Sequence, residues 1–334
     1  FPEVAAAHVK WFSDFDFSQP PRALSEVVDP AFIGLALLSA AVIAALVPLD
    51  RWLERQSWYR RINHGLRMRA GQSRLVMRVG AGMVLLLAWQ ADILLVPDLP
   101  LAAAWVGWVQ FALAALLLFE ATTWLAGAGL LGLYALGVGQ AGLYYMLDYV
   151  LVVGVGYYLI VTGMPERRIA ASSLPALYLT VGFSLCWVAL EKMVWPEWGL
   201  YVLEQYPHLA LGLDVRFFLL AAAFVEFSLG YLLIINLLQR PMALVVTLTF
   251  FLTTLVFGKM EVIGHTLIHA ALIVFLLEGP GTVFQPPIAL HRTPAMRSAF
   301  AGVNVLVLLG ILLPLYAAGA MATHRAVREG EEDP

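Results

Sequence analysis

The chain has 334 residues, of which 61% are hydrophobic and 13% are charged, and its formal net charge is −3. Soluble domains carry about 25% charged residues, so this composition indicates a polytopic membrane protein, and no basic domain for nucleic acid is present. The single cysteine, Cys186, excludes a disulfide within the chain and a Cys-x-x-Cys redox motif.

Residues 1–30 are mixed in character and predict an extra-membrane segment at the periplasmic interface. The first residues, FPEVAAA, are similar to the end of a signal peptide because small residues occupy the cleavage positions. Two interpretations stay open: a leader was removed upstream of or near this point, or the similarity is accidental. If a leader ended at Ala7, His8 would become an N-terminal histidine able to chelate copper.

Residues 31–49 are the first predicted membrane span, with about the 20 residues that a crossing requires. The loop that follows, 50–74, belongs to the most basic stretch of the chain. The positive-inside rule predicts that this loop is cytoplasmic, which places the N-terminus outside.

Nine further apolar stretches complete a prediction of about ten spans. Basic segments at 165–168 and 280–297 fall inside, whereas the acidic loop 196–214 and the polar tail 321–334 fall outside. Both termini are therefore predicted to be periplasmic, at a bacterial inner membrane, and a nine-span solution stays open if 242–279 is broken differently. The nine stretches are 79–96, 103–126, 130–147, 148–164, 175–195, 215–238, 242–259, 261–279 and 298–320.

Aromatic residues gather near the predicted outer ends of the spans, which is typical of an aromatic belt at a membrane interface. They are Trp105, Trp108, Trp195, Trp198 and Tyr201.

The middle eight spans are predicted to be two four-span units, 75–164 and 175–281. Acidic residues carry the match, which pairs Asp92 with Glu191, Glu120 with Glu226, and Asp148 with Glu261. The second unit has Lys192, Lys259, His265 and His269, whereas the first has apolar or small residues around the matching places. We therefore expect the chemistry in the second unit and a structural role for the first. The alternative, that the acids of the first unit mark a proton path, stays open.

The stretch from Lys259 to Gly281 places Glu261, His265 and His269 at spacings of four, on one face of a predicted helix. Ionisable groups at membrane depth are costly and usually face a bundle interior or a wet cavity, which makes this face the candidate site. The structural alternative is that each histidine bonds a backbone carbonyl and that Lys259 neutralises Glu261.

Three segments of the second unit resemble the DoxX family of four-span membrane proteins. They are VALEKMVWPEWG, FVEFSLGYLLIINLLQRP and GHTLIHAALIVFLLEGPG, about 105 residues in all with what lies between them. The first unit matches more weakly, and the residues up to about 75 and the last span lie outside the match. The positions that carry over are Glu191, Lys192, Glu226, Arg240, His265 and the 279–281 turn, with His269 and Glu261 as weaker marks.

This resemblance implies a subunit of a redox complex, because the family includes DoxD-like subunits of thiosulfate:quinone oxidoreductase and subunits that assemble other redox enzymes. A quinone carbonyl needs a donor and a proton source, which His265 or Lys192 would supply while Glu226 passes protons. Glu191 completes this predicted catalytic group, and Arg240, His269 and Lys259 are the predicted cofactor-binding residues.

Two other interpretations stay open. In the first, Glu226, Glu261, His265 and His269 bind a metal ion, although the helix face spans about 12 Å, which is too long for one ion to take all three of its side chains. In the second, the charges are ion pairs that fix helix register in a non-catalytic accessory or assembly subunit. The sequence thus predicts an all-α membrane protein built on two DoxX-like four-helix bundles, with the lipid bilayer and other subunits as partners and a quinone as cofactor; whether it is itself an enzyme stays open.

Overall fold

The computed structural model describes residues 9–11, 13, 15–281, 283–284 and 286–332, and this part of the chain is helical, without a β-strand. The predicted all-α class is therefore confirmed. The α-helices are α1 (Leu24–Val27), α2 (Pro30–Arg55), α3 (Ser57–Arg67), α4 (Ser73–Gln90), α5 (Ala104–Leu116), α6 (Thr123–Ala141), α7 (Leu143–Met146), α8 (Leu151–Val161), α9 (Arg167–Val194), α10 (Pro196–Gln205), α11 (Val215–Ile235), α12 (Gln239–Phe257), α13 (Lys259–Glu278) and α14 (Pro294–Glu332). Short 3₁₀ segments are η1 (Val9–Trp11), η2 (Ala70–Gln72), η3 (Glu120–Thr122), η4 (Leu147–Tyr149), η5 (Pro207–Ala210) and η6 (Pro287–Leu290).

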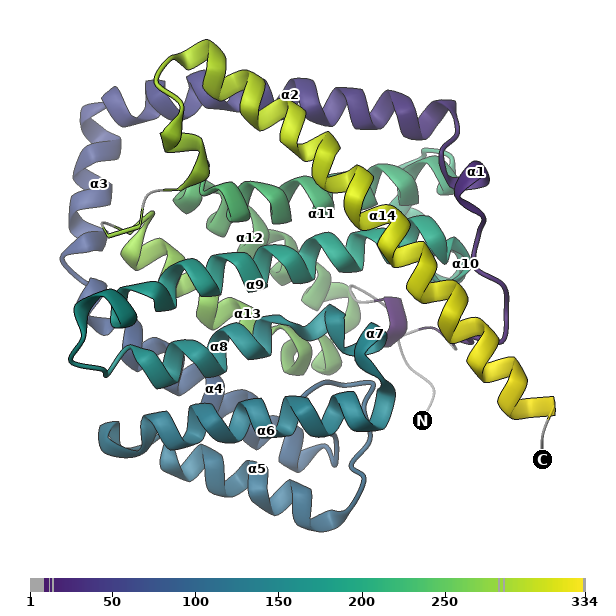
Figure 1. The fold of residues 1–334 in the computed structure, drawn as a ribbon, viewed down its shortest axis with the longest axis horizontal. Coiled ribbons are helices and arrows are strands. Elements are labelled where there is room, and N and C mark those ends of the chain that lie inside the picture. Colours follow the sequence, from purple (N-terminus) through teal and green to yellow (C-terminus); the bar gives the residue numbers. More distant parts are fainter. Residues whose placement is uncertain (1–8, 12, 14, 282, 285, 333–334) are drawn as a thin grey trace.

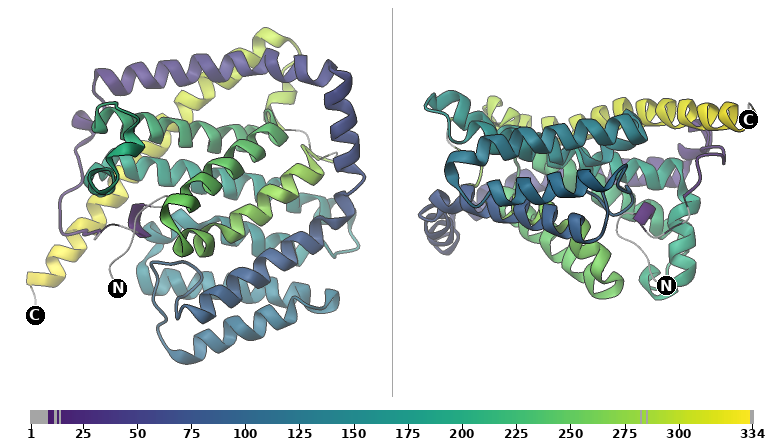
Figure 2. Two further views of the ribbon diagram at one scale, coloured as in Figure 1. Left: turned by 180° about the vertical axis from the view of Figure 1, so that it is seen from behind. Right: turned by 90° about the horizontal axis from the view of Figure 1, so that it is seen from below.

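The long helices lie side by side. Figure 1 shows α6, α8, α9 and α11 running alongside one another, with α14 crossing α11 and α9 obliquely and α3 linking α2 to α4 at one edge. Seen from below in Figure 2, α14 lies along one surface of the molecule. Within the bundle, α8 packs against α9 and α4 packs against α13.

Close helix packing depends on glycine at two crossings. A Cβ atom on Gly182 of α9 would lie 2.5 Å from the carbonyl oxygen of Gly230 in α11, and a Cβ on Gly127 of α6 would lie 2.7 Å from that of Gly156 in α8. Small residues let helix backbones approach closely, which is how helices associate where no hydrophobic effect draws them together.

Two arginines satisfy carbonyl groups at helix ends. Arg78 of α4 donates to the carbonyls of Leu117 and Leu118 after α5, at 2.9 and 2.6 Å. Arg240 of α12 donates to the carbonyls of Leu276 and Leu277 in the last turn of α13, at 2.6 and 3.0 Å. The last carbonyls of a helix lack intrahelical partners, so each arginine stabilises the end of the neighbouring helix. Arg240, a predicted cofactor-binding residue, thus has a structural role here.

Within the described residues, six helices are long and apolar enough to cross a bilayer, and a bent pair would make a seventh. The pair, Leu143–Tyr149 and Leu151–Val161, turns by 62°. Apolar side chains project outward from this bundle, for example Leu37 and Leu38 of α2 at 59% and 57% exposure. These surfaces suit the lipid bilayer that the sequence predicted.

The predicted continuous span 103–126 is wrong. Helix α5 ends at Leu116, Phe119 has an extended backbone, and α6 begins only at Thr123. Glu120 therefore lies in a turn with its side chain 70% exposed, whereas Glu226 lies inside α11. The predicted equivalence of these two acids is wrong for the same reason.

The N-terminal segment enters the bundle instead of lying only at its surface. Lys10 is 3% exposed, and the side chains of Phe15 and Phe17 pack against Trp198 with ring centroids 5.9 and 5.5 Å away. Trp198 and Trp195 are 4% exposed and stack on each other, so they belong to the core and not to an aromatic belt. The expectations for the leader and for His8 fall on residues 1–8, outside the described residues.

Candidate functional site

A buried cluster of three charges lies where η1 meets η4 and the last turn of α9. The Nζ of Lys10 lies 2.6 Å from Asp148 Oδ2 and 2.8 Å from Glu191 Oε2. All three side chains are 1% exposed. Burial opposes the charge of Lys10, but attraction by Asp148 and Glu191 outweighs this effect and raises the pKa of Lys10 above its usual value. The ammonium group is therefore fixed as a cation between two carboxylates.

Aromatic rings and a third carboxylate surround this cluster. Lys10 Nζ lies 4.8 Å from the ring centre of Tyr145 and 5.9 Å from that of Trp198, within the range of a cation–π contact. The hydroxyls of Tyr145 and Tyr149 both donate to the Asp98 carboxylate, the second at 2.8 Å. Burial raises the pKa of Asp98, and the two tyrosine hydrogen bonds partly oppose that shift.

Apart from this cluster, an ion pair joins α9 to α11. Lys192 Nζ lies 2.7 Å from Glu226 Oε2, with the two side chains 10% and 20% exposed. Glu191 and Lys192 are neighbours in α9, so their side chains leave the helix about 100° apart. One therefore faces Lys10 and the other faces Glu226. The sequence predicted both residues as catalytic, and the structure brings Lys192 to Glu226.

The third group lies on α13. Glu261 and His265, one turn apart, are in contact through a carboxylate oxygen and Nδ1. The imidazole of His265 is stacked on Phe250 at 4.1 Å between ring centres and tilted against Trp11 at 5.1 Å. Trp11 reaches this place because Gly264 has no side chain: a Cβ there would lie 1.9 Å from the indole ring.

These groups meet at a cavity of about 50 Å³. Asp148, Glu226 and His265 all line it, together with Trp11 and the ring-bearing residue Tyr149. Trp11 Nε1 donates to the Tyr149 hydroxyl at 3.0 Å, which connects the cavity wall to Asp98 through Tyr149. The cavity thus joins acids of both predicted units with a histidine and with the N-terminal segment.

Of the eight sequence-predicted site residues, two, Glu226 and His265, line this cavity. The other six are Glu191, Lys192, Arg240, Lys259, Glu261 and His269. Arg240 binds carbonyls at the end of α13. His269 packs against Phe250 and Phe251, with ring centres 6.1 and 4.8 Å away. Lys259 is exposed, and its predicted neutralisation of Glu261 has no counterpart among the described contacts, because Glu261 contacts His265 instead.

The buried charges are not confined to the second unit, although the expectation that the chemistry sits there stays a prediction. Asp148 from the first unit and Lys10 from the N-terminal segment hold Glu191, and neither was assigned to the site from the sequence. Tyr145, Tyr149 and Asp98 were missed as well. A signal was present in the sequence, since the acid Asp148 follows the aromatic pair Tyr144–Tyr145 within an apolar stretch.

In the described part of the chain, no three His, Cys, Asp or Glu side chains converge as ligands of one metal ion. Of the four predicted metal ligands, Glu261 and His265 touch each other, Glu226 pairs with Lys192, and His269 makes ring contacts.

Comparison of the chain with known protein families, with curated proteins and with solved structures finds no match. The resemblance to the DoxX family therefore stays a prediction.

Proposed function

We propose that this protein is an integral membrane subunit of a redox complex, in which it supplies protons to a quinone. One observation carries the proposal: Asp148, Glu226 and His265 from separate helical elements line one small cavity inside the bundle. Intramembrane carboxylates and histidines that face a shared cavity are the usual elements of a proton relay.

The balance of charge supports proton handling. In and beside the cavity, five carboxylates lie with two lysines, Lys10 and Lys192, and with His265. Burying uncompensated negative charge is costly, so bound protons are the simplest source of neutrality. A group that holds a proton for this reason can pass it on when a neighbour becomes negative. The carboxylates are Asp98, Asp148, Glu191, Glu226 and Glu261.

The size of the cavity limits what it holds. At about 50 Å³ it has room for a few water molecules and not for a quinone ring. The quinone in this proposal therefore approaches from the lipid side of α12 and α13. Phe251 is 57% exposed there, and the half-buried His269 lies beside it, one helical turn from His265.

We also propose that ten helices cross a bacterial inner membrane, with both termini in the periplasm, and that eight of them form two DoxX-like four-helix units. The packing of α8 on α9 and of α4 on α13 supports the duplication. If α4 corresponds to α9 and α8 to α13, these two contacts are equivalent under a twofold rotation. The site then lies between the units, which explains why both contribute acids.

The test is the quinone content of the purified protein. Protein isolated from its native membrane in mild detergent should carry quinone in near-stoichiometric amount, measured by solvent extraction and chromatography. Glu226→Gln and His265→Ala should slow proton uptake in proteoliposomes when an added quinone is reduced to quinol by a chemical reductant, which supplies the two electrons while the protein delivers the two protons. Glu120→Gln makes the same change at an exposed turn and should have little effect.

A lack of quinone in the wild-type protein would overturn the redox proposal. An accessory role is then favoured if Glu226→Gln also leaves the surrounding complex assembled and active. Elemental analysis of the same sample tests the metal interpretation, which requires a stoichiometric metal that is lost in His265→Ala.

A further inference from the structure

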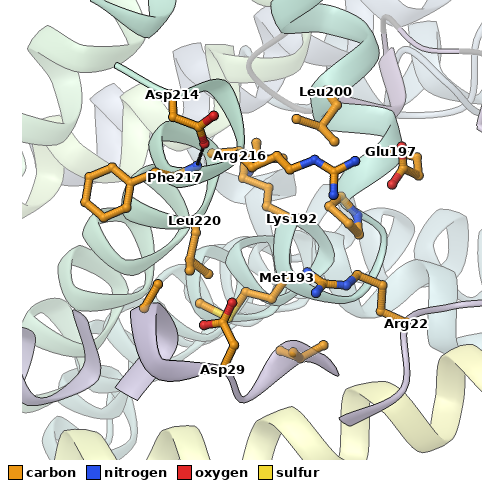
Figure 3. Close-up of a pocket in the computed structure, with 14 residues that line it drawn as sticks. Arg22, Asp29, Lys192, Met193, Glu197, Leu200, Asp214, Arg216, Phe217 and Leu220 are labelled. Atoms are coloured by element: carbon orange, nitrogen blue, oxygen red, sulfur yellow. Dashed lines mark hydrogen bonds between the residues drawn. The ribbon is translucent and has the colours of Figure 1, made fainter. Parts of the chain in front are cut away.

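A second cavity lies where α2, α10 and α11 begin. Its volume is about 280 Å³. In Figure 3, the guanidinium groups of Arg22 and Arg216 enter the same space from opposite sides. Lys192 of α9 adds a third cation to the lining, so cationic donors from three separate segments face one cavity. The charged lining residues are Arg22, Asp29, Lys192, Glu197, Asp214 and Arg216.

All three acids of this cavity lie at helix starts, and two of them accept hydrogen bonds there. Asp29 accepts a hydrogen bond from the backbone N–H of Phe32 at 2.7 Å, and Asp214 accepts one from that of Phe217 at 2.9 Å. Glu197 lies in the first turn of α10. Each carboxylate therefore compensates the positive end of its own helix and is less available to the arginines.

The arginines keep free donor capacity. Within the described residues, neither Arg22 nor Arg216 forms a salt bridge, and Arg22 donates one hydrogen bond, to the Glu26 carbonyl at 2.7 Å. A guanidinium carries five N–H donors in a planar fork that matches the oxygens of a carboxylate or phosphate. The unfilled donors of two such forks are suited to an oxyanion between them.

We propose that this cavity binds an oxyanion group such as phosphate, sulfate or carboxylate, held by Arg22 and Arg216. Lys192 is shared between this anion and Glu226, which lies 2.7 Å from the lysine. The same chemistry is offered by a free anion in solution and by the headgroup of an anionic lipid. This site stands on its own contacts and does not depend on the proposed proton role.

Sharing of Lys192 couples the two sites. An anion attracts Lys192 away from Glu226, and a charged Glu226 holds it back. Removing the charge of Glu226 therefore strengthens anion binding, and the coupling is reciprocal by thermodynamic linkage. A cavity that held only water would not respond to Glu226 in this way.

The first arm of the test uses full-length protein in dodecyl maltoside. Titration calorimetry and thermal unfolding measure binding of inorganic phosphate and sulfate against chloride at constant ionic strength. Arg22→Gln and Arg216→Gln should each weaken the Kd by about tenfold or more, since each removes charge-assisted hydrogen bonds. Glu226→Gln should tighten it. Arg325→Gln, an exposed arginine of α14 outside the cavity lining, is the matched control and should change nothing.

The second arm separates the two sources of the anion. Protein in nanodiscs of phosphatidylglycerol or of phosphatidylcholine is analysed by native mass spectrometry for retained lipid. Retention of phosphatidylglycerol without phosphate or sulfate binding assigns the site to a headgroup, and phosphate or sulfate binding in detergent assigns it to a free anion. Arg216→Lys keeps the charge and should retain most of the binding, which separates loss of a ligand from loss of folding.

The proposal is overturned if wild-type protein prefers neither oxyanions to chloride nor the anionic lipid to phosphatidylcholine. It is also overturned if Arg216→Gln and Arg325→Gln have equal effects on binding of the anion, free or in a lipid headgroup, that the wild-type protein retains.

Discussion

At the scale of single residues, the buried ion cluster around Lys10 ties the N-terminal segment to η4 and to the last turn of α9. Its ammonium group contacts Asp148 and Glu191 at 2.6 and 2.8 Å, in a place where none of the three side chains reaches solvent. Removing one partner of a buried ion cluster leaves an uncompensated charge, which typically costs about 3–5 kcal/mol. Lys10 is thus a stability residue first, and it also sets the charge next to the cavity acids.

We expect Lys10→Met to lower the free energy of unfolding by about 3–5 kcal/mol, measured by denaturation in detergent. Adding Asp148→Asn and Glu191→Gln removes the stranded charges and should recover much of the loss. Lys259→Met, at an exposed lysine, is the control. Folding raises the pKa of Lys10 above the usual lysine value of 10.5. The contribution of this pKa shift to the free energy of unfolding is therefore complete below pH 10.5 and is lost only as the pH rises through the higher pKa of the folded protein. Equal effects of Lys10→Met and Lys259→Met would contradict this account.

The part of this site that lies inside apolar helices could be predicted from the sequence. Glu191, Lys192, Glu226 and His265 are ionisable residues inside apolar helices, where they are conspicuous. Lys10 lies outside any predicted span, where a charged side chain carries no such signal. Its burial depends on the folding-back of a segment far away in sequence, which hydropathy does not encode.

At the scale of helices, α9 and α11 approach closely where Gly182 and Gly230 face each other. Gly230 faces the backbone of α9, and a Cβ there would lie 2.6 Å from the Gly182 carbonyl oxygen and 2.9 Å from Cys186 Sγ. A backbone oxygen cannot rotate away as a flexible side chain can, so the helices must separate. Lys192 and Glu226 connect the same two helices, and their pairing depends on this spacing.

Gly230→Ala should therefore destabilise the protein by about 1–3 kcal/mol, the usual cost of overpacking. Gly132→Ala in α6 is the matched control, because a Cβ there meets nothing within 4 Å. In that exposed position alanine should be neutral or stabilising by up to about 1 kcal/mol, since it is the better helix former. Unfolding temperatures in detergent compare the two variants, and equal values would show that the glycine contact does not set the helix spacing.

The end of helix α5 is a feature that hydropathy does not predict. Residues 113–119, LAALLLF, are all compatible with a continuing helix, yet α5 ends at Leu116. The break is stabilised from a distance by Arg78 of α4, which donates to the carbonyls of Leu117 and Leu118, and locally by the Thr122 hydroxyl, which donates to that of Phe119. Such partners are tertiary, so a sequence window predicts that a helix exists more reliably than where it ends.

At the scale of the whole molecule, charge differs between the two ends of the bundle. Figure 1 shows α3 at the edge opposite α10. Helix α3 carries Arg60, Arg61 and Arg67 together with the exposed apolar residues Trp58 and Ile62, which suits a helix lying in an anionic membrane interface. Helix α10 starts with an acidic first turn instead. The positive-inside rule therefore predicts that α3 lies on the cytoplasmic side.

This orientation is tested with single cysteines at the two ends. In a Cys186→Ala background, His64→Cys in α3 and Glu204→Cys in α10 place thiols at exposed positions. A membrane-impermeant maleimide added to intact cells should label position 204 at once and position 64 only after the membrane is opened, because arginines are retained on the cytoplasmic side. Gel shift or mass spectrometry reads the labelling. The reverse pattern would invert the orientation and place the oxyanion cavity in the cytoplasm, and labelling of both positions from outside would rule out a bilayer between α3 and α10.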